Sequence, residues 1–364
     1  MSAVNIAFFG SSLVSSYWNG AATYYRGIIR ALHQLGYRIT FYEPDAYGRQ
    51  EHRDLKEDPS WATVRVYPSD STDGVYQALE TAQDAEWIVK ASGVGVFDEL
   101  LEREVALLRP AGGTIFWDVD APATLERMQY DPADPFRDPL RKYDLVLTYG
   151  GGEPVVRAYL ALGAQACVPI YNALDPSTHF PVLPRAEFQA DLSFLGNRLP
   201  DREARVEEFF FGAAEQLPDR NFLLGGNGWG DKQRPRNVRN LGHVATDDHN
   251  AFNSSALAVL NISRDSMARY GFSPATRVFE AAGARACLIT DAWEGIETFF
   301  EPEREILVAH SGAEVAGIVR SLSPQSARKI GEAAYTRALS DHTYEQRAVE
   351  VDTILAGRLS LGVG

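Results

Sequence analysis

Cysteine is scarce in this chain of 364 residues, which holds only Cys167 and Cys287. Each lies in or beside an apolar stretch that predicts a strand, and the two fall in different halves of the chain. We therefore expect two buried, reduced thiols, as in a cytoplasmic protein, because free cysteine behaves as a small buried hydrophobe there.

Long apolar runs and an excess of basic residues are also missing. No stretch is apolar and long enough to cross a bilayer, so we expect no integral membrane segment. Residues 1–10 lack the basic region of a signal peptide and predict a first buried strand instead. Lys and Arg number 35 against 49 Asp and Glu, for a formal net charge of -14. Because nucleic-acid backbones are bound through clustered Lys and Arg, we expect no nucleic-acid partner.

The glycine fingerprint of dinucleotide-binding enzymes is absent where it would be expected. Residues 4–9 predict a strand, residues 20–35 an amphipathic helix, and residues 38–42 a second strand with Glu43 at its tip. The turn between them reads Gly10-Ser-Ser-Leu-Val-Ser and lacks the glycines that let a pyrophosphate approach the backbone. A nicotinamide-dependent oxidoreductase is therefore only our third choice.

What the chain does contain is a regular alternation of strand and helix patterns. The hydrophobic content of 45% and the charged content of 23% are those of a globular protein, and the length allows two domains. The alternation predicts an α/β fold. Prolines cluster in residues 171–190, which we interpret as a linker. We expect a first domain over residues 1–175, a second over residues 190–340 and a final helix over residues 341–364.

One unit of the second half has the features of an anion site. Residues 258–262 and 286–290 predict buried parallel strands. Between them, Ser273 and Pro274 predict the start of a helix that ends near Gly283. Free N–H groups and the helix dipole at such a start favour a diphosphate at the carboxyl ends of the strands.

Glu280 is the exceptional residue of this predicted helix, because its neighbours are apolar. An unpaired carboxylate in such surroundings is costly, and two ribose hydroxyls would serve as its partners. An ion pair with Arg277, three residues earlier, explains the glutamate equally well.

The same block resembles a known family. Residues 272–283 read Phe-Ser-Pro-Ala-Thr-Arg-Val-Phe-Glu-Ala-Ala-Gly, and Leu-Ile-Thr-Asp, Glu-Gly-Ile-Glu-Thr-Phe-Phe-Glu-Pro and Glu-Ile-Leu-Val follow. This resembles the donor-site block of GT-B glycosyltransferases, most closely the CgeB-like (spore-maturation) group, and the resemblance is strong from Asp191 to Val308. It implies two Rossmann-like domains facing a central cleft, with a final helix that crosses back to the first domain.

The resemblance also implies a nucleotide-sugar donor, with Glu280 on the ribose and Ser273 to Thr276 near the diphosphate. We expect a UDP- or dTDP-linked donor, no cofactor and no metal, because the N–H groups and the dipole at the helix start already balance the diphosphate charge. The glycine-rich turn at residues 225–230 offers Trp229 for stacking on the base. Many retaining members carry a second glutamate eight positions before the ribose glutamate; this chain has Phe272 there, which leaves the stereochemical outcome open. The candidate donor contacts are Arg198, Gly226, Asn227, Trp229, His243, Ser273, Pro274, Ala275, Thr276, Arg277 and Glu280.

Two acids, Asp118 and Asp120, follow a predicted strand in the first half. A pair at this spacing is similar to the metal-binding motif of the GT-A fold. The nucleotide signals lie in the second half, however, so we favour a general base for an acceptor hydroxyl, with Asp120 ahead of Asp118. The alternative is a pair of solvated turn acids before a helix.

The first half would hold the acceptor, a small molecule or a glycan. The candidate acceptor contacts are Ser11, Ser12, Tyr17, Trp18 and Gly151. Ordinary helix packing explains the two aromatic residues equally well, and Gly151 could equally serve a tight turn.

We therefore predict a glycosyltransferase that moves a sugar from a nucleotide donor to a hydroxyl without a metal. The alternatives are a nucleotide-sugar epimerase of the same fold and a non-catalytic nucleotide-sugar-binding protein.

Overall fold

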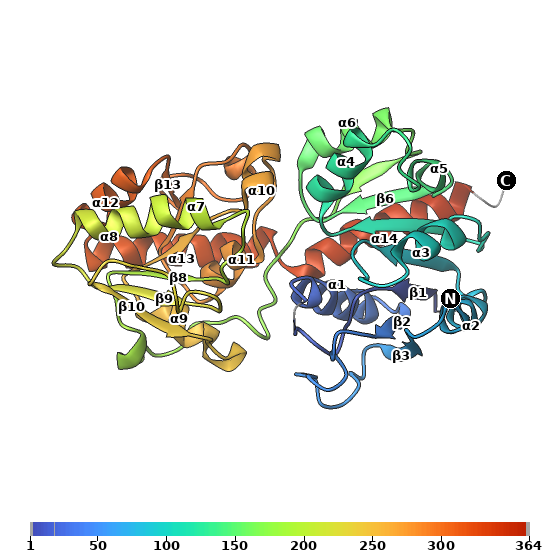
Figure 1. Cartoon of the computed structure of the whole chain (residues 1–364), viewed down its shortest axis with the longest axis horizontal. Coiled ribbons are helices and arrows are strands. Elements are labelled where there is room, and N and C mark those ends of the chain that lie inside the picture. Colours follow the sequence, from blue (N-terminus) through green and yellow to red (C-terminus); the bar gives the residue numbers. More distant parts are fainter. Residues whose placement is uncertain (1–2, 18, 362–364) are drawn as a thin grey trace. The chain divides into compact units, whose positions relative to one another are not determined.

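The computed structural model of the protein describes residues 3–17 and 19–361, and the chain forms two compact units. Unit 1 comprises Met1–Tyr171 and Tyr344–Gly364, and unit 2 comprises Asn172–Thr343. Each unit is built on one parallel sheet with helices on both faces (Figure 1). The α/β class is therefore as predicted.

The sheet of unit 1 has seven strands in the order β3-β2-β1-β4-β5-β6-β7. The direction of the strand order reverses between β1 and β4, and open α/β sheets commonly bind ligands at the carboxyl ends of the strands at such a point. The strands are β1 Asn5–Phe9, β2 Arg38–Asp45, β3 Thr63–Pro68, β4 Trp87–Ala91, β5 Gly113–Asp118, β6 Leu145–Thr148 and β7 Cys167–Pro169.

The helices of unit 1 include the last one of the chain. At Gly27 in the first helix, an added Cβ atom would lie 2.2 Å from Cδ2 of Tyr344, so only glycine lets the first and last helices approach this closely. The helices are α1 Ala22–Gln34, α2 Thr72–Ala82, α3 Asp98–Val105, α4 Ala121–Tyr130, α5 Arg137–Leu140, α6 Gly152–Ala161 and α14 Tyr344–Leu361.

Unit 2 has a six-stranded parallel sheet in the order β10-β9-β8-β11-β12-β13. Here the strand order reverses between β8 and β11, where Val259 of β11 lies opposite Ser193 of β8 and Leu288 of β12. The strands are β8 Leu192–Leu195, β9 Phe222–Gly225, β10 Val238–Gly242, β11 Ala258–Asn261, β12 Leu288–Asp291 and β13 Leu307–Ala309.

The helices of unit 2 cover a core rich in phenylalanine. Residues 203–216 run through α7, a π-helical turn and α8, with Phe209, Phe210 and Ala213 buried as their spacing predicts. The α-helices are α7 Glu203–Val206, α8 Gly212–Gln216, α9 His249–Ser255, α10 Asp265–Tyr270, α11 Thr276–Gly283, α12 Gly312–Ser321 and α13 Pro324–Asp341, and the π-helical turn is Glu207–Phe211.

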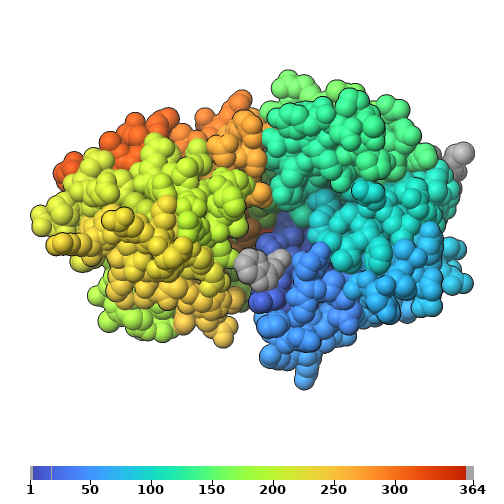
Figure 2. All heavy atoms as spheres, viewed as in Figure 1, coloured from blue at the N-terminus to red at the C-terminus, as the bar shows by residue number. Residues whose placement is uncertain are grey.

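Short apolar strands explain the two cores. The strands β6, β8, β9, β11 and β12 are buried along their whole length, as expected for parallel strands covered by helices on both faces. Polar sequence lies outside: the segment between β2 and β3, in mid-blue, projects at the surface of unit 1 in Figure 2.

Two expectations from composition can be compared with the structure directly. Cys167 and Cys287 are both buried and free, as predicted, and burial raises the pKa of each thiol to about 12. Across the described residues, no helix combines the length and the apolar character that crossing a bilayer requires.

Candidate functional site

Helix α11 of unit 2 begins later than its sequence predicts. Its first residue is Thr276, and Ala275 is the extended residue before it. The Ser273 hydroxyl donates to the Gly271 carbonyl at 2.8 Å instead of capping the helix, so the predicted start at Ser273 and Pro274 is wrong. The reason is the buried side chain of Asn172, which donates to the Pro274 carbonyl at 3.2 Å and accepts from the Thr276 hydroxyl at 3.5 Å.

The loop before α11 is conformationally demanding. Gly271 has φ +70° and Phe272 has φ +46°, a left-handed conformation that is uncommon for a phenylalanine. Phe272 N–H donates to the Glu294 carbonyl at 2.6 Å, and its ring fills the space above Gly295. The position that holds a second glutamate in many retaining relatives therefore serves packing in this chain.

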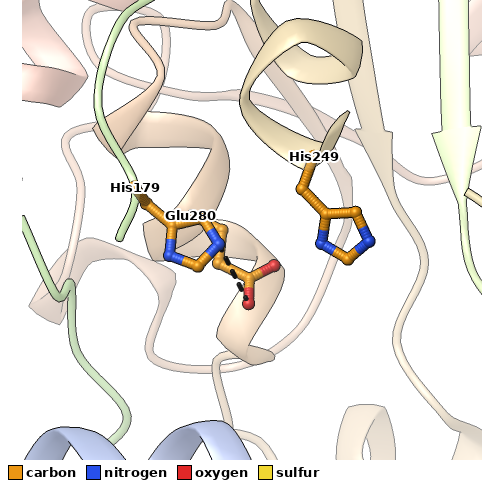
Figure 3. Close-up of side chains that lie close together, drawn as sticks. All are labelled: His179, His249 and Glu280. Atoms are coloured by element: carbon orange, nitrogen blue, oxygen red, sulfur yellow. Dashed lines mark ion pairs between the residues drawn. The ribbon is translucent and has the colours of Figure 1, made fainter. Parts of the chain in front are cut away.

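The Glu280 carboxylate lies between the rings of His179 and His249 (Figure 3). Its side chain is 12% exposed, and His179 Nε2 lies 3.7 Å from its Oε1. Burial alone would raise the pKa of Glu280, but the positive potential of His179, Arg277 and His249 outweighs burial and holds the pKa below its usual value. The carboxylate is therefore ionised at neutral pH and available to accept hydrogen bonds.

The sequence alternative of an Arg277–Glu280 ion pair is not what the structure shows. Among the described residues, the ion-pair partner of Glu280 is His179, and Arg277 acts on the carboxylate only through its potential. Burial lowers the pKa of Arg277, and the charge of Glu280 opposes that shift. Within the described part of the chain, the buried Nη1 of Arg277 has no hydrogen-bond partner. A buried N–H donor without a hydrogen-bond partner destabilises the fold unless a ligand accepts its hydrogen bond.

Two further arginines were not predicted from the sequence: Arg202 lies near Arg277, and Arg264 lies near Arg202. Burial and the charges of Arg277 and Arg264 lower the pKa of Arg202 to about 10, although Asp201 and Asp291 oppose the shift. Arg264 Nε pairs with Asp201 at 2.5 Å. Arg202 follows β8 and Arg264 follows β11, so both flank the point where the strand order reverses. Their position after strand ends was the only signal for them in the sequence.

The glycine-rich turn after β9 is shaped by close backbone contacts. Gly226 has φ +120°, and an added Cβ atom would lie 2.2 Å from the Gly196 carbonyl oxygen, so no other residue fits. Trp229 is 1% exposed, and its Nε1–H donates to the same carbonyl at 2.7 Å. The prediction that Trp229 stacks on the base is therefore wrong: its ring belongs to the core, packed edge-on against Phe211.

The remaining donor candidates are placed at the surface of unit 2. Asn227 and His243 are exposed. Arg198 pairs with Glu203 at 2.8 Å and with Asp231 at 3.2 Å. Two carboxylates thus already compensate the charge of Arg198, which leaves less of it for a diphosphate.

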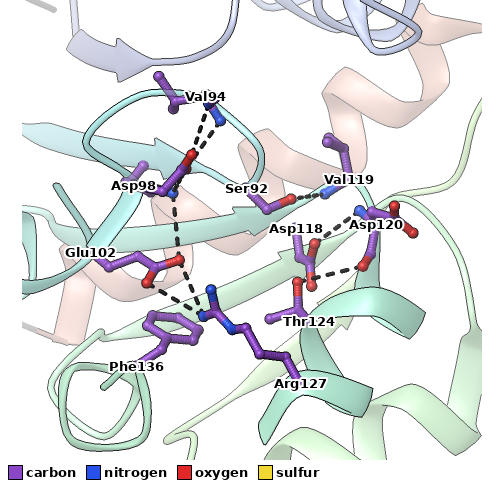
Figure 4. Close-up of polar contacts among 12 residues, drawn as sticks. Ser92, Val94, Asp98, Glu102, Asp118, Val119, Asp120, Thr124, Arg127 and Phe136 are labelled. Carbon is purple, nitrogen blue, oxygen red and sulfur yellow. Dashed lines mark hydrogen bonds and ion pairs between the residues drawn. The ribbon is translucent and has the colours of Figure 1, made fainter. Parts of the chain in front are cut away.

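In unit 1, Asp118 and Asp120 have different environments (Figure 4). Asp118 is fully buried at the end of β5; it accepts the hydroxyl proton of Tyr159 and the Asp120 N–H at 2.9 Å. Burial raises the pKa of Asp118, and the hydrogen bonds from Tyr159 and Ser92 oppose the rise. Because Asp118 is enclosed in this way, it cannot contact an acceptor and instead positions the turn. The prediction that it is a general base and the alternative that it is a solvated turn acid are therefore both wrong for Asp118.

Asp120 is half-buried and directly precedes α4. Its carbonyl accepts the Thr124 N–H at 3.2 Å and the Thr124 hydroxyl at 3.4 Å, while its N–H is held by Asp118. The backbone of Asp120 is thus fixed at the carboxyl edge of the sheet. Of the two acids, it is the one that a ligand can reach.

The loop after β1 does not offer the predicted hydroxyls. Ser11 is buried and donates to Asn19 Oδ1 at 2.9 Å, and Ser12 is buried and donates to Glu43 Oε1 at 3.0 Å. Arg49 Nη1 donates to the Ser11 carbonyl at 3.1 Å. Because these groups are already bonded, the prediction that Ser11 and Ser12 contact the acceptor through their hydroxyls is wrong.

The other acceptor candidates differ in accessibility. Tyr17 is 41% exposed and stacks on His52, with 4.2 Å between ring centroids. Trp18 lies outside the described residues. Gly151 is buried with φ +89°, and an added Cβ atom would lie 2.0 Å from Val155 Cγ2, so this glycine serves the tight turn before α6.

Known proteins resemble this chain in family and in fold. Residues 202–353 match the family model described as glycosyl transferase-like. Sucrose-phosphate synthase from Thermosynechococcus elongatus has a TM-score of 0.73 at 13% identity, over 98% of this chain and 100% of that chain. Anabaena HepE, solved with UDP-glucose, has a TM-score of 0.68 at 13% identity, over 97% of this chain and 99% of that chain.

A third similar structure is an alpha-glucosyltransferase solved with UDP and a 13-mer DNA. Its TM-score is 0.68 at 11% identity, over 97% of this chain and 100% of that chain. No curated protein sequence matches the chain. The structural matches establish that the chain has the GT-B fold, and its residues 202–353 are similar to a glycosyl transferase-like family.

Proposed function

We propose that the protein transfers a glycosyl group from a UDP- or dTDP-linked donor to an acceptor hydroxyl, without a metal. The observation that carries the proposal is the buried Nη1 of Arg277, which has no hydrogen-bond partner among residues 3–17 and 19–361 and lies in the same helix as the ionised Glu280. A nucleoside diphosphate supplies both what Arg277 lacks, an anion, and what Glu280 can accept, two hydroxyl protons.

In this proposal the ribose and the diphosphate bind at neighbouring positions along helix α11 of unit 2. Glu280 accepts the ribose hydroxyls, and the N–H groups at the start of α11 donate to the diphosphate. Arg277 adds a guanidinium, and Arg202 and Arg264 add further positive potential. Since these groups already balance the diphosphate charge, a divalent ion is not required.

Asp120 is the proposed general base of unit 1, and the acceptor is a small molecule or a glycan. The net charge of -14 disfavours DNA or RNA as the acceptor, although one similar structure was solved with DNA. UDP-glucose in the HepE structure supports a uridine donor. We place the protein in the cytoplasm on its two free thiols and in the CgeB-like group on its donor-block sequence.

Nucleotide-dependent melting tests the donor. We expect UDP or dTDP to raise the melting temperature of the protein, because a ligand at one hundred times its dissociation constant stabilises by about 2.7 kcal/mol. NAD and NADP should produce no shift. A shift with NADP alone would contradict a glycosyl donor site and restore the oxidoreductase alternative.

Glu280→Gln tests the ribose contact. We expect UDP to bind about tenfold more weakly, because a hydrogen bond to a charged acceptor contributes about 1.5 kcal/mol or more and the neutral amide forms a weaker one. Calorimetric titration of UDP measures the change. Glu297→Gln, at an exposed glutamate of the same unit, is the matched control and should bind UDP like the wild type. Equal affinities for the two variants would show that Glu280 has a structural role only.

A further inference from the structure

Three potential metal ligands converge in unit 2 from three separate segments. Figure 3 shows the Glu280 carboxylate of α11 between the imidazole rings of His179 and His249. The ligand atoms of the three side chains all lie within 4.8 Å of one another. The two histidines enter neither the donor chemistry nor the acceptor chemistry proposed above, so their convergence on one carboxylate needs its own explanation.

Contacts with Thr178 and Glu280 orient the two ring nitrogens of His179. Nδ1 lies 3.0 Å from the Thr178 hydroxyl, within hydrogen-bond distance, and that hydroxyl also contacts the Asp175 carbonyl at 3.3 Å. Nε2 is turned toward Glu280, with 3.7 Å to its Oε1. An ion between Nε2 and Oε1 would be bound by both atoms.

His249 is held in a similar way. Its ring forms a hydrogen bond to the Val244 backbone, which leaves the other ring nitrogen for the cluster. Metal-binding histidines commonly use one nitrogen for the ion and the other for an oxygen that fixes the ring. Thr178 and Val244 supply that second contact for the two histidines here.

We propose that His179, His249 and Glu280 bind a divalent transition-metal ion, with Zn²⁺ as its representative and water as the fourth ligand. Two imidazoles and one carboxylate form a known three-residue donor set for zinc. Zinc–ligand distances of about 2.0–2.2 Å place tetrahedral ligand atoms about 3.3 Å apart, so small side-chain rotations would close the site. Mg²⁺ and Ca²⁺ prefer oxygen ligands and suit it poorly.

Arg277 limits the affinity of this site, because its positive charge acts on the same carboxylate. The ion therefore binds when the nucleotide is absent, more weakly than in a structural zinc site. Since Glu280 is also the proposed ribose ligand, the ion and the donor compete. The competition rests on the proposed function, whereas metal binding does not.

Calorimetric titration of Zn²⁺ into the metal-free, untagged full-length protein tests the site directly. We expect one bound ion, no heat from Mg²⁺, and with Co²⁺ a visible absorption band from a histidine-ligated site. His179→Gln and His249→Gln should each weaken Zn²⁺ binding by more than the roughly 10- to 100-fold that loss of a second-shell partner costs. His310→Gln is the matched control: His310 is an exposed histidine with its own glutamate partner, Glu314 at 3.1 Å. Melting curves without metal verify that each variant is folded.

Titrations in the presence of UDP separate the two parts of the proposal. Zn²⁺ binding that weakens as UDP is added supports both. Zn²⁺ binding that ignores bound UDP overturns the competition and removes Glu280 from the ribose. UDP binding without any Zn²⁺ binding overturns the metal site and leaves the donor assignment intact. Stoichiometric Zn²⁺ binding that survives in both histidine variants also overturns the site.

Discussion

Asp120→Asn is expected to lower turnover by roughly 100- to 10,000-fold, the range typical of a lost general base. The amide keeps the size of the side chain, and the backbone of Asp120 stays fixed by Asp118 and Thr124. UDP affinity should not change, because the nucleotide contacts proposed above all come from unit 2. Initial rates of sugar transfer together with UDP titration measure the two quantities separately.

Two controls make the Asp120 result specific. Asp118→Asn should instead lower the melting temperature, because the buried carboxylate accepts both the Tyr159 hydroxyl and the Asp120 N–H. A chelator should leave turnover intact in the wild type, since the proposed donor site needs no ion. Loss of UDP binding in Asp120→Asn, together with sensitivity to chelator, would establish a metal-binding acid pair instead. Wild-type turnover in Asp120→Asn would reduce Asp120 to a turn residue.

Arg277→Met is the second substitution with a large expected effect. It should weaken UDP binding by about 10- to 150-fold, which corresponds to the 1.5–3 kcal/mol of a hydrogen bond to a charged group. The melting temperature of the nucleotide-free protein should not fall, because methionine removes a buried N–H group that has no partner in the described structure. UDP affinity is thus expected to fall without a loss of stability in the nucleotide-free protein.

Comparison with another arginine substitution isolates the role of Arg277. Arg304→Met replaces an exposed arginine that pairs with Glu301, and it should change neither UDP affinity nor melting temperature measurably. If Arg277→Met destabilised the nucleotide-free protein and bound UDP normally, the guanidinium would be a structural group and the diphosphate would have to bind elsewhere.

The elements that position the site could be predicted from local sequence, because they depend on local patterns. Buried strands such as 258–262 and 286–290 were recognisable as short apolar runs. The structure places β11 within the first run, and β12 overlaps the second and ends one residue later, at Asp291. The carboxylate of Glu280 was recognisable because charge is rare on an apolar helix. These features need only neighbours within a few residues, which the sequence displays.

The partners of the site residues could not be predicted, because they are distant in sequence. Asn172 donates to the Pro274 carbonyl across 102 positions, next to the start of α11 at Thr276. His179 meets Glu280 from a segment that its prolines suggested was a linker, yet Asn172 and His179 are buried in unit 2.

Whether a side chain with a polar group is buried is the other property that could not be predicted from local sequence. Trp229 sits in a turn of glycines, which suggests an exposed ring, but the Gly196 carbonyl and the Phe211 ring hold it inside. Ser12 likewise follows a glycine in a predicted loop, but it is bonded to the buried Glu43. In each case a tertiary partner that accepts a hydrogen bond makes burial favourable.

The contact of Gly27 with Tyr344 has a consequence for how the protein is synthesised. Chains emerge from the ribosome amino end first, and domains tend to fold in that order. Unit 1, however, receives α14 only after all of unit 2 has been translated. Until then the surface of α1 around Gly27 lacks the helix that covers it. Unit 1 is therefore the first unit to begin synthesis and the last to be completed. A chain whose translation stops just before Tyr344 contains all of unit 2 but lacks α14 of unit 1.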